Sequence, residues 1–193
     1  MIQPGVPAPE VFAGCAVKDA EGVATTLGQV WAERTTLLYF VRHFGCIGCS
    51  ESLARLRPVL GELQRLEVQV VLVGCGSPRF IPDFLERHHL LSAPLRCVTD
   101  ETLSAHQLAG LAYGPWGGWG PRGLFEQARA FLAGHQAGPV QGDPHQQAGA
   151  VLIDAAGRVR WVHRNRSLGD HASMTALLGA VLASWADAHP QAL

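Results

Sequence analysis

Three short apolar runs, each followed by a helical pattern, constrain the fold of this chain more than any other feature. The runs are rich in β-branched and aromatic residues and have the length of buried strands; they cover residues 35–41, 68–73 and 95–99. Helical signals follow each run. Strands that alternate with helices pair in parallel through right-handed crossover connections. The pattern therefore predicts an α/β domain whose central strands are parallel.

The two ends of the chain extend this pattern. Residues 150–153 and 159–163 are strand-like and flank a turn, so we expect a hairpin that supplies one antiparallel edge. A last helix is expected over residues 173–188. Residues 1–34 mix Pro, Gly and short apolar stretches, which predicts an N-terminal extension, either an arm or a hairpin. Because no repeat or convincing linker divides the chain, residues 1–193 are predicted to form a single domain, a central mixed sheet flanked by helices.

Capping and breaking residues refine the expected helices. Pro58 should kink a helix over residues 50–66, because proline removes a backbone hydrogen bond. Ser77 and Asp100 are expected to cap the next two helices at their N-termini. A further helix is expected over residues 124–133.

Composition excludes several classes of function. The chain of 193 residues carries 16 acidic and 15 basic side chains, so nothing indicates a nucleic-acid surface or an anionic membrane surface. No segment approaches the ~20 apolar residues that span a bilayer, and the first residues lack the features of a signal peptide. We therefore expect a soluble, cytoplasmic protein.

Two of the five cysteines, Cys46 and Cys49, form a C-x-x-C pair between the first buried strand and the helix after it. The free N–H groups and the positive dipole end of a helix N-terminus favour a thiolate, and thiol pKa values there fall from about 8.5 to about 3.5–7.5. Residues three apart on a helix lie about 5–6 Å apart, which a disulfide can bridge. Cys46 and Cys49 are therefore the predicted catalytic residues of a redox pair.

The order of the two cysteines predicts their roles. Cys46 is the more N-terminal, so we expect it to be the more exposed and to act as the nucleophile, with Cys49 as the resolving thiol. Arg42 and His43 lie just upstream, and a cation near the sulfur would favour the thiolate further. A solvent-facing position for Arg42 is equally expected.

Two other interpretations of the pair remain open. A structural zinc site would need a second C-x-x-C or a His pair at ligand spacing, and the adjacent His88 and His89 face different ways on a helix. A buried, inert pair is the other alternative. Cys75 and Cys97 lie at the end of or within apolar strands and are expected in the core, while Cys15 could be a third redox partner.

Several longer stretches resemble a known family. They are residues 5–9, residues 40–49, residues 149–154, and His163-Arg164 through Gly169-Asp170. On these residues the chain resembles the alkyl hydroperoxide reductase and thiol-specific antioxidant (AhpC/TSA) superfamily, and within it the peroxiredoxin-like, SelU-like branch that carries C-x-x-C. The resemblance implies a thioredoxin-like fold and thiol-based redox activity.

The resemblance leaves the roles of the two cysteines open. In related proteins a selenocysteine can occupy the first motif position, which supports Cys46 as the nucleophile. Ordinary peroxiredoxins have Thr-x-x-Cys, and on that pattern Cys49 would attack the peroxide. Ala148 and Gly149 stand where peroxiredoxins usually place an arginine, and the cis-proline that thioredoxins place near this point is also missing. The resemblance therefore assures neither an efficient peroxidase nor an ordinary thioredoxin.

The leading hypothesis is a thiol-dependent oxidoreductase, an antioxidant enzyme that reduces peroxides or substrate disulfides through a Cys46–Cys49 disulfide. The residues present require no metal, flavin or nucleotide cofactor, so electrons would come from an external thiol reductant of the thioredoxin or glutathione type. The alternative is a non-catalytic binding module of the same fold, which would contact a partner through Trp116 and Trp119 in a Gly/Pro-rich loop over residues 110–123.

Overall fold

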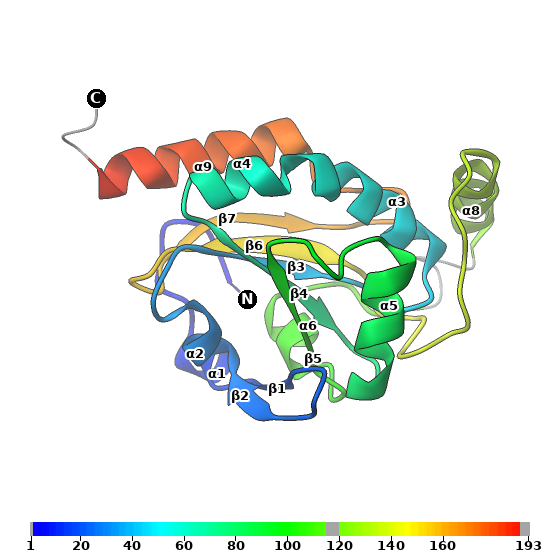
Figure 1. The fold of residues 1–193 in the computed structure, drawn as a ribbon, viewed down its shortest axis with the longest axis horizontal. Coiled ribbons are helices and arrows are strands. Elements are labelled where there is room, and N and C mark those ends of the chain that lie inside the picture. The colour runs from blue at the N-terminus through cyan, green and yellow to red at the C-terminus, as the bar shows by residue number, and fades with distance from the viewer. Residues whose placement is uncertain (1, 115–119, 190–193) are drawn as a thin grey trace.

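The computed structural model describes residues 2–114 and 120–189 and shows an α/β fold with helices on both sides of a sheet (Figure 1). Within these residues the sheet has seven strands in the order β2-β1-β5-β4-β3-β6-β7. The strands are β1 (Ala16–Lys18), β2 (Ala24–Thr26), β3 (Thr36–Phe40), β4 (Gln69–Gly74), β5 (Leu95–Thr99), β6 (Gly149–Ile153) and β7 (Val159–Arg164).

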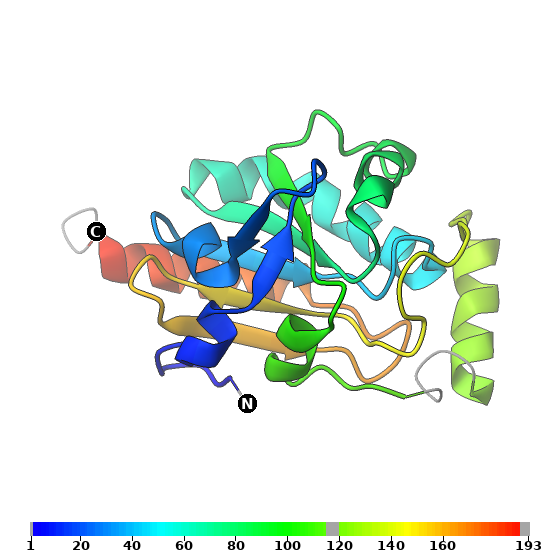
Figure 2. The ribbon, with the colours of Figure 1, turned by 90° about the horizontal axis from the view of Figure 1, so that it is seen from below.

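The central strands pair as the alternating pattern predicts. β3, β4 and β5 are parallel neighbours, and β6 and β7 form the expected antiparallel hairpin, with β6 beside β3. The N-terminal extension is a hairpin: β1 and β2 are antiparallel, and β1 joins β5 through the pair Lys18 and Thr99. The sheet is therefore mixed as predicted, but antiparallel strands lie at both edges rather than one (Figure 2).

The helices form a layer on each face of the sheet. They are α1 (Glu10–Ala13), α2 (Leu27–Trp31), α3 (Ile47–Leu56), α4 (Leu60–Arg65), α5 (Ile81–Arg87), α6 (Ser104–Leu108), α8 (Pro121–Leu132) and α9 (Met174–Ala188). Buried residues of α3, α4, α5 and α9 share one core cluster, and those of α1, α2 and α6 share the other. Helix α8 stands at one end of the molecule, beyond the sheet (Figures 1 and 2).

Most of the expected helix signals act as predicted. The 3₁₀ turn η1 (Arg57–Val59) contains Pro58 and separates α3 from α4, which confirms the kink. The N-cap residue of α6 is Leu103, not Asp100 as predicted, but the Asp100 carboxylate accepts a hydrogen bond from the Ala105 N–H at 2.7 Å in the first turn. Ser77 is the N-cap residue of the 3₁₀ turn η2 (Pro78–Phe80), as predicted in position, but its side chain makes no capping hydrogen bond; its backbone carbonyl accepts the Phe80 N–H at 3.1 Å.

Strand β3 divides its side chains between the two cores. Leu37 and Tyr39 belong to the cluster under α3, while Leu38 and Phe40 belong to the opposite one. This alternation is the two-residue period of a strand that is buried on both faces. Because β3 is central, the loop that leaves its carboxyl end and starts α3 is held on a rigid base.

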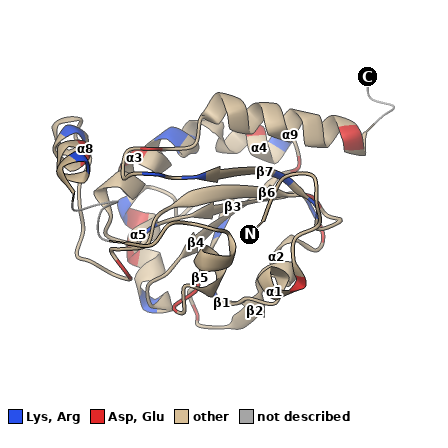
Figure 3. Cartoon of the chain, turned by 180° about the vertical axis from the view of Figure 1, so that it is seen from behind, with Lys and Arg blue, Asp and Glu red and all other residues tan. Residues whose placement is uncertain are grey.

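Charged side chains are interspersed over the fold, with basic and acidic residues mixed in the view of Figure 3. Among the described residues, no helix combines the length and apolar character that crossing a membrane requires.

We expect Leu72→Ala to lower the free energy of unfolding by about 2–5 kcal/mol, because it leaves a cavity in place of a fully buried side chain of β4. Urea denaturation measures this loss. Leu91→Ala is the matched control, since Leu91 is largely exposed and should change stability by less than about 0.5 kcal/mol. Equal losses in the two variants would contradict this description of the core.

Candidate functional site

The C-x-x-C pair lies where the chain passes from β3 into α3. Cys46 is the N-cap residue of α3, and Cys49 lies in its first turn. The helix begins at Ile47, earlier than the predicted residue 50, so the pair spans the helix start as expected. All five cysteines, including these two, are free thiols.

The two glycines of the motif are required by close packing. A Cβ atom at Gly45 would lie 1.9 Å from the carbonyl oxygen of Pro139, and one at Gly48 would lie 2.7 Å from Cγ of Leu168. Distances this short leave no room for any side chain. The motif backbone is therefore in direct contact with two distant segments, one before β6 and one after β7.

These segments bury both sulfurs. Cys46 is 5% exposed and Cys49 is 3% exposed, so Cys46 is the more exposed of the two as predicted, although by a small margin and with neither residue at the surface. Cys46 nevertheless borders a cavity of about 200 Å³. Its lining is apolar at Ile47, Val140 and Leu168, and it includes Arg42 and His43. Access to the sulfur is through this cavity.

The hydrogen bond between the two sulfurs gives them different properties. The Cys49 thiol donates to Cys46, which, against the effect of burial, lowers the pKa of Cys46 to about 6; Arg42 and the N–H groups of Gly48 and Cys49 add to this. The same hydrogen bond, together with burial, raises the pKa of Cys49 well above its ordinary value. This arrangement favours the thiolate form of Cys46 and the protonated form of Cys49.

Arg42 is a buried cation beside this pair, not a solvent-facing one. It is 3% exposed; Nε donates to the Gln146 carbonyl at 3.0 Å and Nη2 to the Pro144 carbonyl at 2.7 Å. Its backbone N–H donates to Sγ of Cys49 at 3.2 Å. Among the residues that the structure describes, Nη1 has no hydrogen-bond partner. One residue thus supplies both a positive charge and an anchor for the segment before β6.

His43 is neutral at the wall of the cavity. Burial, with help from the Arg42 charge, lowers its pKa to about 4. Its Nδ1 accepts a hydrogen bond from the Gly45 N–H at 3.3 Å. Because Nδ1 is the acceptor, the ring proton lies on Nε2, which makes His43 a hydrogen-bond donor at neutral pH.

The other three cysteines differ from Cys46. Cys75 and Cys97 are buried as predicted, and burial raises their pKa values to about 11 and about 12. The Cys75 thiol donates to the Arg42 carbonyl at 2.7 Å. Cys15 lies in the core cluster on the opposite face of the sheet from Cys46 and Cys49, and burial raises its pKa. None of the three has the properties of an activated thiol.

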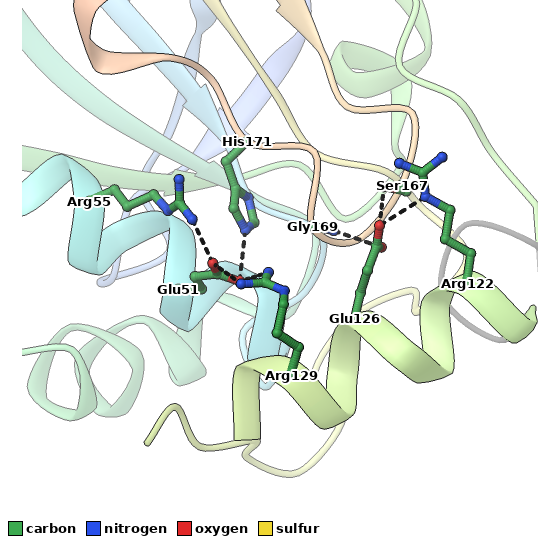
Figure 4. A network of polar contacts seen from close by, with 8 residues as sticks. All are labelled: Glu51, Arg55, Arg122, Glu126, Arg129, Ser167, Gly169 and His171. Carbon is green, nitrogen blue, oxygen red and sulfur yellow. Dashed lines mark hydrogen bonds and ion pairs between the residues drawn. The ribbon is translucent and has the colours of Figure 1, made fainter. Parts of the chain in front are cut away.

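The sequence pattern did not reveal a network around Glu51, which is almost fully buried on α3 (Figure 4). Arg129 of α8 binds its carboxylate with two hydrogen bonds, at 3.0 and 2.6 Å, and Arg55 adds one at 2.8 Å. Nε2 of His171 lies 3.2 Å from the same carboxylate. Burial would raise the Glu51 pKa, but these partners outweigh it and lower the pKa to about 2. Only the Glu51–Arg55 spacing carries a sequence signal, an i,i+4 pair.

The packing at Ala148 and at Gly149, the first residue of β6, explains the missing arginine. A Cβ at Gly149 would lie 2.5 Å from Cδ2 of Leu111 and 2.6 Å from the His163 carbonyl oxygen, and Ala148 is buried. No arginine fits there without rearrangement, and Arg42 brings its charge to the pair from the end of β3 instead. The described residues contain no cis peptide bond. They also contain no group of three His, Cys, Asp or Glu side chains placed to hold a metal ion.

The sequence is similar to a known protein family and to several of its relatives. A family model described as AhpC/TSA antioxidant enzyme matches residues 55–167, a segment that begins after both cysteines. Peroxiredoxin-like 2C from Mus musculus and from Homo sapiens are each 27% identical to the chain over 187 residues, which span 92% of the chain and 81% of each relative. Thioredoxin-like protein AAED1, chloroplastic, from Arabidopsis thaliana is 21% identical, over 86% of the chain and 70% of the relative.

Solved structures confirm the thioredoxin-like fold. Reduced Prx3 from Vibrio vulnificus in complex with H2O2 superposes with a TM-score of 0.66 at 16% identity, covering 93% of this chain and 99% of that one. MTB dsbF, in mixed oxidized and reduced forms, superposes with a TM-score of 0.58 at 16% identity, covering 92% and 98%. Such identities indicate a shared fold and carry no further assignment.

We expect Arg42→Met to raise the pKa of Cys46, because the variant removes the buried positive charge beside the thiolate. The rate of alkylation by iodoacetamide, measured from about pH 5 to about pH 9 with peptide mapping, reports this pKa. Arg42→Lys keeps the charge and should shift the profile less, and the exposed Arg34→Met should not shift it. An unchanged profile in Arg42→Met would show that the charge does not act on Cys46.

We expect Glu51→Gln to lower the free energy of unfolding by about 2 kcal/mol at pH 7, because it removes charge-assisted hydrogen bonds to a buried group. The folded pKa lies below the unfolded value of about 4.3, so the stabilisation is complete above the unfolded pKa and disappears as the pH falls through the folded value. The difference between wild type and variant should therefore shrink from about pH 5 to about pH 2 in urea titrations.

The control is Glu62→Gln, which removes an exposed carboxylate paired with Arg65. Exposed pairs contribute little, so this variant should unfold like wild type at every pH. A Glu51→Gln penalty that stayed constant down to pH 2 would argue against an ionised Glu51 as its source.

Proposed function

Because the chain belongs to the AhpC/TSA antioxidant enzyme family, we propose that it is a thiol-dependent oxidoreductase in which Cys46 attacks the substrate and Cys49 resolves the product. Family membership supports thiol-dependent antioxidant chemistry in general. The roles of the two cysteines rest on the position of Cys46 at the N-cap of α3, on the wall of the cavity, together with the lowered pKa of its thiol beside Cys49.

The proposed reaction with a hydroperoxide runs in three steps. The Cys46 thiolate attacks the terminal oxygen, the O–O bond breaks, and the leaving oxygen takes a proton and departs as an alcohol or water. Cys46 is then a sulfenic acid, whose sulfur the Cys49 thiol attacks; an S–S bond forms and water leaves. An external dithiol exchanges with this disulfide, supplies two electrons and returns both cysteines to thiols.

Arg42 and His43 support the first step from the cavity wall. The Arg42 charge stabilises the attacking thiolate. The neutral His43 carries its proton on Nε2, so it is able to donate a hydrogen bond to the oxygen that leaves. Both residues line the same cavity as Cys46.

The burial of Cys46 favours a small peroxide over a protein disulfide as the substrate. A cavity of about 200 Å³ has room for a small hydroperoxide, and its lining at Ile47, Val140 and Leu168 suits an apolar substituent. A disulfide on a folded protein would reach the sulfur only if the segment over it moved, since Cys46 is almost completely covered.

The rival hypothesis of a non-catalytic binding module stays a prediction. Trp116 and Trp119, on which it depends, lie outside the described residues. The cytoplasmic location and the thioredoxin- or glutathione-type reductant likewise stay predictions.

We expect Cys46→Ser and Cys49→Ser each to abolish peroxide turnover with an external thiol. Mass spectrometry after one equivalent of hydrogen peroxide should show a loss of about 2 Da in wild type, as the Cys46–Cys49 disulfide forms. Cys49→Ser should gain about 16 Da at Cys46, the sulfenic acid, whereas Cys46→Ser should stay unoxidised.

The control is Cys15→Ser, whose hydroxyl keeps a donor toward the Val11 carbonyl that Cys15 contacts, and it should turn over like wild type. Sulfenic acid at Cys49 in the Cys46→Ser variant would reverse the proposed roles. Full turnover in both single mutants at the pair would refute the proposed function.

A further inference from the structure

Helix α8 presents its apolar side to solvent. Leu124 is 55% exposed, Phe125 71%, Phe131 69% and Leu132 85%, and Ala128 between them is also exposed. Successive residues on a helix turn by about 100°, so these five share one stripe. Surface helices usually bury such a stripe against their own core. Here the apolar stripe faces outward instead.

Polar contacts hold the opposite side of α8 against the molecule (Figure 4). The Glu126 carboxylate accepts hydrogen bonds from the Ser167 hydroxyl and the Gly169 N–H, both at 2.8 Å. Arg129 makes its two hydrogen bonds to the buried Glu51. Rotating the helix to hide the apolar stripe would break these charge-assisted bonds and leave the buried Glu51 without Arg129. The outward direction of the stripe is therefore a stable feature of the fold.

Four large apolar side chains at this exposure form a patch on the order of several hundred Å², the size at which patches mark interaction sites. The stripe contains no charged side chain, because Glu126 and Arg129 lie on the inner side (Figure 4). An uncharged apolar stripe on a helix suits another apolar helix as its partner.

The order of residues along the stripe identifies that partner. Residues 124–132 read LFEQARAFL, and the large apolar residues are placed symmetrically about Ala128. A leucine lies four residues from Ala128 on each side, and a phenylalanine lies three residues from it on each side. When two copies pack antiparallel about a two-fold axis at Ala128, Leu124 meets Leu132 of the other copy and Phe125 meets its Phe131. A two-fold interface requires this self-complementarity, and a small central residue lets the two helix axes approach closely.

We propose that the α8 stripe is a homodimer interface, in which α8 of a second copy of this chain packs antiparallel across Ala128. One helix face covers less than the roughly 800 Å² per partner of a standard stable interface, so the dimer is weak, with a Kd in about the micromolar to millimolar range. The helix also carries Gln127 to the wall of the Cys46 cavity. The dimer would thus form next to the cavity that Cys46 borders.

Sedimentation velocity from about 1 to about 500 µM tests the interface. Wild type should shift from monomer toward dimer as concentration rises. Phe125→Ser/Phe131→Ser should stay monomeric with an unchanged circular dichroism spectrum, because both side chains are exposed in the monomer. Val11→Ser/Val23→Ser removes two equally exposed apolar side chains elsewhere and should associate like wild type.

Disulfide trapping tests the two-fold axis, in a Cys46→Ser/Cys49→Ser background with diamide as the oxidant that takes up the two electrons. Ala128→Cys should give a covalent dimer, since the axis brings the two sulfurs together. Leu124→Cys should not, because antiparallel packing sets its two copies about 12 Å apart along the axis. A monomer at every concentration, association that survives the Phe125/Phe131 double variant, or no trapping at residue 128 would each overturn the proposal.

Discussion

The candidate site depends on the buried Arg42, because its guanidinium, its backbone N–H and its backbone carbonyl each make a separate contact there. Its guanidinium holds the segment before β6 through the carbonyls of Pro144 and Gln146, while its charge lowers the pKa of Cys46. Its backbone N–H binds the sulfur of Cys49, and its carbonyl accepts the thiol of Cys75. Arg42 closely follows β3, an interior strand of the sheet, so the charge, the cavity wall and the motif are all attached to the same interior strand.

Much of the fold follows from local patterns. The buried strands, the break at Pro58 and the start of a helix beside Cys46 each arise from a few neighbouring residues, and the structure confirms them. The near-complete burial of Cys46 could not be predicted in this way. It depends on Pro139 and Leu168, which reach the motif glycines from distant parts of the chain, and no periodicity encodes that contact. The inward position of Arg42 has the same origin, since its partners lie more than a hundred residues later.

The different roles of the two cysteines are also beyond what a local sequence pattern can predict. Spacing places both at the N-terminus of a helix, where either thiol gains from the backbone N–H groups. Which sulfur donates the hydrogen bond and which accepts it depends on their surroundings. Cys46 receives the N–H groups of Gly48 and Cys49 and borders the cavity of about 200 Å³, whereas Cys49 receives the Arg42 N–H and does not line that cavity. The difference in pKa between the two thiols therefore depends on tertiary packing, and the C-x-x-C pattern alone does not predict it.

The packing of the motif also bears on how this protein can change over evolutionary time. Gly45 and Gly48 have no space for a side chain, and both cysteines are needed for the proposed chemistry. Among residues 45–49 this leaves Ile47, whose side chain lines the cavity, as the position free to vary. Natural drift and protein engineering would therefore face the same restriction. A change of substrate preference within the motif can come only from residue 47, because packing fixes the two glycines and the proposed chemistry fixes the two cysteines.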